Sequence, residues 1–153
     1  MVAMVAMDAT RRIRFDGLRI AAAIFLAANI LHTVDHVRQH MAGLNVVIMI
    51  GGGTLTAAAV LVAVVALRRD LRAPAVAALV GLVAAALVAA SHVVPHWSVI
   101  SASYLDDVHP DVLSWAVTLL EVASGLFLGV VGIRRIRMPE QVAATTESAE
   151  RTP

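Results

Sequence analysis

Cysteine is absent from the 153-residue sequence, and so is lysine. Without cysteine the chain cannot form a disulfide scaffold, carry out thiol redox chemistry or bind a metal through thiolates. Charged residues make up only 15% of the chain and aromatic residues 4%, whereas a soluble domain has about 25% charged residues. The formal net charge of +1 argues against a nucleic-acid partner.

Apolar residues are in excess, at 59% of the chain. They gather in four runs, each close to the ~20 residues that a helix needs to cross a bilayer. Their continuous apolarity excludes the alternating pattern of a membrane barrel, and short connections make consecutive helices antiparallel neighbours. The sequence therefore predicts an all-α integral membrane protein, a four-helix bundle with up-down-up-down topology. The predicted helices cover about residues 18–37, 46–67, 73–94 and 112–133.

Arginine is concentrated beside alternate helix ends. It precedes the first run, fills the connection 68–72 and follows the fourth run, whereas the other two connections contain only Arg38. The positive-inside rule then places both termini and the second connection in the cytoplasm, for a multi-pass protein of the inner (plasma) membrane. Residues 1–17 are predicted to be a basic cytoplasmic flank, residues 18–137 the membrane domain and residues 138–153 a disordered cytoplasmic tail.

The six histidines all lie at the opposite, extracytoplasmic side of this topology. They are His32, His36, His40, His92, His96 and His109. An H-x-x-x-H motif ends the first run and another ends the third, and residues four apart project from one face of a helix. The first and third helices of a square bundle are diagonal, so the two pairs should face each other across its centre. We expect His32, His36, His92 and His96 to bind a metal there.

Oxygen donors accompany the histidines. Asp35 is predicted to be a ligand or to orient one, and His109 to be a further ligand from the long connection 95–111. Glu121 lies about ten residues inside the fourth helix, where a carboxylate costs at least ~2.5–3.5 kcal/mol unless it is paired or protonated. Either Glu121 or Asp107 would accept a proton from a metal-bound water.

Three residues are expected to line a cofactor at similar depth: Asn29, Gly52 and Thr118. Gly52 belongs to a triple glycine that either leaves room for a ligand or lets a neighbouring helix pack closely.

Several residues near the site have simpler explanations. Asp111 fits a helix N-cap, and Arg38 can pair with Asp35. Trp97 and Tyr104 suit the aromatic belt of a membrane interface. Pro95 disfavours helical geometry at the preceding residue and threatens the second histidine pair. Glycines four residues apart in the fourth run, Gly125 and Gly129, favour plain helix packing.

Imidazole and carboxylate ligands suit Zn, Fe, Mn or Cu, and the number of ligands allows two ions. A membrane metalloenzyme at this site would act on a lipid, a quinone or a small periplasmic molecule in or near the outer leaflet. One alternative is a membrane protein that binds a single b-type haem. Another is a non-enzymatic protein that carries a metal or senses metal or pH. The sequence leaves open whether the protein is an enzyme, and its small-residue stripes make a homodimer plausible.

The two H-x-x-x-H motifs resemble the histidine boxes of membrane fatty-acid desaturases and hydroxylases. The resemblance covers only His32–His36 and His92–His96. Those enzymes have more boxes, include H-x-x-H-H, and place them on the cytoplasmic side, so their diiron chemistry does not carry over.

Overall fold

The computed structural model describes residues 2–39, 46–106 and 110–150, and their side chains in 16–39, 46–106 and 110–137. In this part of the chain the helices are α1 (Val2–Arg38), α2 (Val46–Leu67), α3 (Ala73–His92) and α4 (Val112–Glu150). Each contains a segment long and apolar enough to cross a membrane: Asp16–Arg38, Val46–Leu67, Ala73–His92 and Val112–Arg137. The prediction of an all-α chain with four membrane-length helices is confirmed.

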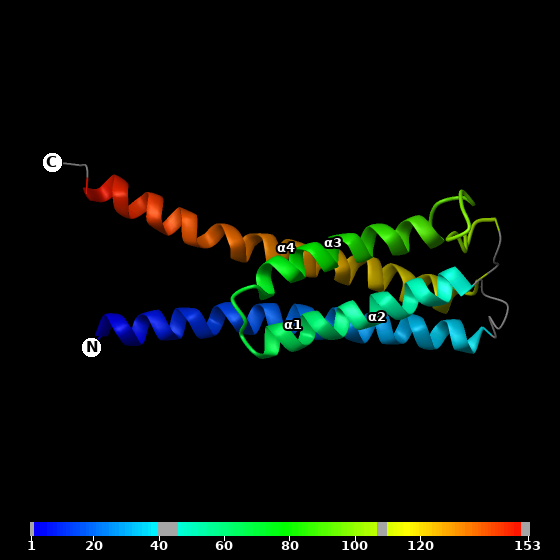
Figure 1. Cartoon of the computed structure of the whole chain (residues 1–153), viewed down its shortest axis with the longest axis horizontal. Coiled ribbons are helices and arrows are strands. Elements are labelled where there is room, and N and C mark those ends of the chain that lie inside the picture. The colour runs from blue at the N-terminus through cyan, green and yellow to red at the C-terminus, as the bar shows by residue number, and fades with distance from the viewer. Residues whose placement is uncertain (1, 40–45, 107–109, 151–153) are drawn as a thin grey trace.

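Successive helices run in opposite directions, as Figure 1 shows. Both termini lie at the same end of the molecule as the α2–α3 connection, which we call the arginine end because it contains Arg68, Arg69 and Arg72. The α1–α2 and α3–α4 connections lie at the other end, which we call the histidine end because α3 finishes there at His92. This is the predicted up-down-up-down order, with short α1–α2 and α2–α3 connections and a longer one between α3 and α4.

The four helices pack in a square arrangement. Helix α4 packs closely against α3 and also contacts α1, and α2 packs against α1 and α3, whereas α1 and α3 touch only slightly. Between α2 and α4 the described residues make no contact. Helices α1 and α3 are therefore diagonal, and side chains of both can meet at the bundle centre.

Glycine brings α3 and α4 together. A Cβ atom added to Gly81 would lie 2.6 Å from both the carbonyl oxygen of Gly125 and the backbone nitrogen of Gly129. One at Gly132 would lie 2.6 Å from the backbone nitrogen of Ala78. No real side chain tolerates such distances, so the backbones can approach only because these positions have no Cβ. The packing role predicted for Gly125 and Gly129 is confirmed.

The triple glycine of α2 has different surroundings. Gly51, Gly52 and Gly53 are exposed, and an added Cβ at any of them would meet no atom within 4 Å. Close helix packing therefore does not explain these glycines within this chain. The cofactor-binding role of Gly52 stays a prediction.

Helix bounds differ from the predicted ones at three points. Helix α1 begins at Val2 and α4 ends at Glu150, so helix continues through most of the basic flank and of the tail for which the composition predicts disorder. Alanine and glutamate are good helix formers, and extending an existing helix adds a hydrogen bond for each residue that is ordered. Helix α3 ends at His92, two residues earlier than predicted.

Candidate metal centre

Three histidine side chains meet at the histidine end. His32 and His36 lie one turn apart on α1, and His92 is the last residue of α3. Ring centroids are 4.6 Å apart for His32 and His36, 5.0 Å for His32 and His92, and 5.3 Å for His36 and His92. One nitrogen of each ring lies within 4.8 Å of the other two, an arrangement that could hold a metal ion. The expected convergence of imidazoles from the two diagonal helices is confirmed for these residues.

His32 is held in place by a contact with helix α4. Its Nδ1 contacts Oε2 of Glu121, and Nδ2 of Asn29 donates a 2.8 Å hydrogen bond to Oε1 of the same carboxylate. All three side chains are at least 95% buried. Glu121 is thus paired inside the membrane-spanning region, which offsets part of the cost of placing a carboxylate there. Among the described side chains, the Oδ1 atom of Asn29 is buried with no hydrogen-bond partner.

His92 is held by the connection that follows it. Its Nδ1 lies 3.1 Å from the carbonyl oxygen of Ala102. The connection folds back over the end of α3, because the backbone N–H of Ala102 donates to Ser91 and that of Tyr104 donates to His92, both over 2.9 Å. Residues 101–104 are buried. The long connection in which we expected functional residues therefore covers the site.

Both supports leave the same ring nitrogen for a metal. A histidine that binds a metal commonly donates its other N–H to a carboxylate or a backbone carbonyl, which fixes its tautomer and orientation. Glu121 supplies the carboxylate for His32 and Ala102 supplies the carbonyl for His92. In both rings the Nε2 atom is then the one that can bind a metal. His36, which is half-buried, completes the group.

Two hydroxyl groups border the histidines. The ring of Tyr104 packs 4.8 Å from that of His92, measured between centroids. The hydroxyl of Thr118 donates to that of Tyr104 over 3.3 Å and lies 3.4 Å from Nε2 of His32. Burial raises the pKa of Tyr104, so this phenol stays protonated at neutral pH. Thr118, expected near a cofactor, lies beside the histidine group.

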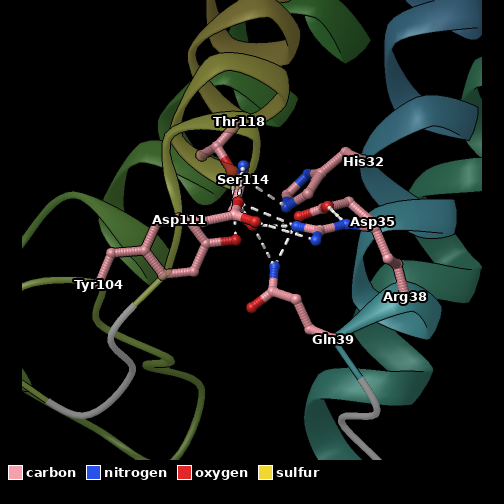
Figure 2. Close-up of polar contacts among 8 residues, drawn as sticks. All are labelled: His32, Asp35, Arg38, Gln39, Tyr104, Asp111, Ser114 and Thr118. Carbon is pink, nitrogen blue, oxygen red and sulfur yellow. Dashed lines mark hydrogen bonds and ion pairs between the residues drawn. The ribbon is translucent and has the colours of Figure 1, made fainter.

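A network of polar side chains joins α1 to the start of α4 beyond the histidines (Figure 2). Arg38 donates to Asp35 over 2.7 Å and contacts both oxygens of Asp111 at 2.9 Å. Gln39 donates to Asp35 and to Ser114, each over 2.6 Å. The backbone N–H of Ser114 in turn donates to Asp111 over 2.9 Å, which confirms Asp111 as the N-cap of α4.

This network gives Asp35 two partners outside the histidine group, and its role as a ligand or as a residue that orients one stays a prediction. The predicted pairing of Asp35 with Arg38 is confirmed, and both carboxylate oxygens of Asp35 accept hydrogen bonds from Arg38 and Gln39. The three-histidine group does not include Asp35. At the other carboxylate of the network, the hydrogen bonds from Arg38 hold the pKa of Asp111 down at about 2.

Two expectations based on the sequence are wrong. His92 and His96 do not form a pair on one helix face, because α3 ends before Pro95, and His96 is exposed and lies outside the three-histidine group. The backbone N–H of His96 instead donates to Asp106 over 2.9 Å. Tyr104 does not face outward as a residue of the aromatic belt would but is buried against His92. Trp97 is 52% exposed, as the interface belt requires.

Two predicted site residues, Asp107 and His109, lie outside the described residues, as does His40. The sequence reasoning also missed three contributors: Gln39, Tyr104 and the carbonyl of Ala102. Gln39 could have been suspected, because it is a polar residue that directly follows the last turn of α1. A backbone carbonyl has no sequence signal at all.

Comparison with known proteins gives no relative from which a role could be transferred. No family model matches the chain, and neither the curated proteins nor the solved structures contain a significant match.

Proposed function

We propose that this chain is a multi-pass membrane protein that binds one transition-metal ion through the Nε2 atoms of His32, His36 and His92. The observation that carries the proposal is the combination of three converging imidazoles with two rings supported at Nδ1. Histidines that merely fill a core have no need of ring nitrogens that lie within 4.8 Å of one another. Three neutral nitrogen ligands are typical of metal sites that act on a substrate or exchange a ligand.

Neutral imidazoles favour divalent zinc, iron, manganese or copper, with affinity rising toward copper along the usual order for nitrogen sites. The carboxylates nearest the group, Asp35 and Glu121, are already occupied with Arg38, Gln39, Asn29 and His32. This supports a single ion rather than a dinuclear site within the described part of the chain. Two histidines that share a haem must lie on opposite faces of the porphyrin, and three rings in mutual contact leave no room for it.

The distribution of arginine supports an extracytoplasmic position for the metal. Arginines flank the end of the bundle opposite the histidines, so the positive-inside rule places the termini in the cytoplasm and the site at the outer face of the inner membrane. A substrate or ligand would then arrive from the outer leaflet or from the space beyond it. Reporter fusions at residues 68–72 and at the C-terminus should both report a cytoplasmic location.

The central test is the metal content of the purified full-length protein. We expect about one equivalent of Zn, Fe, Mn or Cu by elemental analysis, with no haem absorption band. Single variants H32A, H36A and H92A should each lose the metal, because removing one of three ligands leaves too few donors for a stable site.

The matched control is H96A, since His96 is an exposed histidine of the same end of the bundle. It should keep the full metal content. A wild-type protein that stays metal-free after incubation with these four ions would overturn the proposal. So would loss of metal in H96A to the same degree as in H92A.

A further inference from the structure

The hydroxyl of Thr118 lies directly beside His32 and has only long contacts. Thr118 is completely buried. Its contacts with other described residues are 3.4 Å to Nε2 of His32 and 3.3 Å to the hydroxyl of Tyr104. Both are longer than the ~2.5–3.0 Å of ordinary hydroxyl hydrogen bonds. A buried hydroxyl with only long contacts has capacity for a further partner.

The distance between the Thr118 oxygen and Nε2 of His32 indicates where a further hydrogen-bond partner of Thr118 would lie. Two donor atoms bound to one tetrahedral ion at ~2.0–2.1 Å lie roughly 3.3 Å from each other. The Thr118 oxygen is 3.4 Å from the His32 nitrogen that would face the metal. A ligand that lies roughly 3.3 Å from the same nitrogen, on the side of α4, can also be within hydrogen-bond distance of the Thr118 oxygen. Thr118 therefore borders the fourth coordination position, for which the three histidines supply no ligand.

The direction in which the Thr118 hydroxyl donates determines which ligands the fourth coordination position prefers. Once a metal occupies Nε2 of His32, that nitrogen has no lone pair with which to draw the single hydroxyl proton of Thr118 away from Tyr104. The Thr118 hydroxyl then donates to Tyr104, as it already does, and turns a lone pair toward the fourth position. A lone pair attracts a ligand that carries its own proton and repels a bare anion.

We propose, resting on the metal-binding function above, that the fourth position takes an oxygen ligand bearing a hydrogen, which Thr118 accepts and Tyr104 keeps oriented. Water, hydroxide and the hydroxyl of an alcohol belong to this class. Bare anions such as azide, with no hydrogen to donate, are disfavoured. Thr118 contacts the bound ligand, and Tyr104 acts through Thr118 as a positioning residue.

The test uses the full-length protein loaded with Co²⁺, whose visible spectrum reports the ligands and geometry of the ion. Azide is titrated into wild type, T118V and Y104F. We expect weak azide binding to wild type and about tenfold tighter binding to T118V, because the opposing lone pair is gone; one hydrogen bond is worth about this factor. Y104F should also bind azide more tightly, because the Thr118 hydroxyl loses its acceptor and becomes free to donate to the anion.

T118S is the matched control, because it keeps the hydroxyl and removes only a methyl group. Its azide affinity should equal that of wild type. If T118V and Y104F bind Co²⁺ stoichiometrically and azide no more tightly than wild type, the ligand preference is wrong while the metal site stands. If wild type binds neither Co²⁺ nor any of Zn, Fe, Mn and Cu, the proposed function itself fails.

Discussion

The two ends of the bundle hold their helices together in different ways. Toward the arginine end, α3 and α4 meet backbone to backbone through Gly81, Gly125 and Gly129. At the histidine end, α1 and α4 are joined by polar side chains, notably His32 to Glu121 and Arg38 to Asp111. The first kind of contact stabilises a membrane bundle without any ligand. The second includes a buried carboxylate, which is costly in a membrane and indicates function.

This contrast predicts that mutations in the two regions have separable effects. Substitutions in the glycine contacts should unfold the protein, and the protein should lose its metal only because it unfolds. Changes at the histidine end should alter metal binding in a protein that stays folded.

The largest effect is expected for G81L. A side chain at residue 81 would lie 2.6 Å from backbone atoms of α4 that cannot move aside without parting the helices. Overpacking costs typically ~1–3 kcal/mol, and a clash with backbone should reach the upper end of this range or exceed it. The measurement is thermal unfolding in detergent.

The control for G81L is G52L, since a Cβ at residue 52 meets nothing within 4 Å. It should unfold at the wild-type temperature. Equal destabilisation by the two variants would contradict the role assigned to the α3–α4 contact.

The next effect concerns Glu121 and metal affinity. E121A leaves Nδ1 of His32 without its acceptor, and loss of such a support commonly weakens metal binding by ~10–100-fold. E121Q keeps a carbonyl oxygen for the ring and should lose less. Competition with a chromogenic chelator measures the affinity.

S124A serves as the comparison, because the Ser124 hydroxyl donates to the backbone carbonyl of Glu121 rather than to its carboxylate. Its metal affinity should match that of wild type. An E121A protein with unchanged affinity would show that the His32–Glu121 contact has no part in metal binding.

Metal removal should loosen one end of the molecule selectively. Metal at 100 times its dissociation constant stabilises the folded state by about 2.7 kcal/mol, and chelation removes this. The loss should appear in hydrogen exchange at the backbone amides of Ala102 and Tyr104, whose connection holds His92. Amides of α3 near Gly81 should keep their protection. Uniform loss along the chain would mean that the two ends are not separable.

The smallest expected effect is the acid response of Asp111. Its pKa is lowered from 3.8 to about 2, chiefly by hydrogen bonds from Arg38. A carboxyl whose pKa is lower in the folded state adds stability above the unfolded pKa, and this is lost as pH falls through the folded pKa. Metal-free wild type should therefore lose stability between about pH 4 and pH 2, and D111N should lose less over the same range. Parallel curves for the two proteins would exclude this contribution.

Regular features of the site could be predicted from the sequence. Helical spacing placed His32 and His36 on one face, and the alternation of helix directions made α1 and α3 diagonal, so that His92 came within reach. The depth of Glu121 in its helix, similar to that of Asn29, was also predictable, because the rise per residue is constant.

The partners of these residues were not predictable, because they depend on how the connection after α3 folds. Pro95 carries a known effect on the preceding residue, but the place where α3 ends is decided by competition between helix and the turns that follow. Because α3 ends at His92, His96 is not on the helix face, and Ala102 and Tyr104 come into contact with His92. No periodicity describes a segment of this kind, so its contacts are visible only in three dimensions.

The contact between His32 and Glu121 joins α1 to α4. During synthesis α1 leaves the ribosome long before α4, and until α4 has entered the membrane His32 has no carboxylate to orient it. The support of His32 is thus in place only after α4 has been inserted. Loading with metal would accordingly distinguish chains that have inserted α4 from chains interrupted before it.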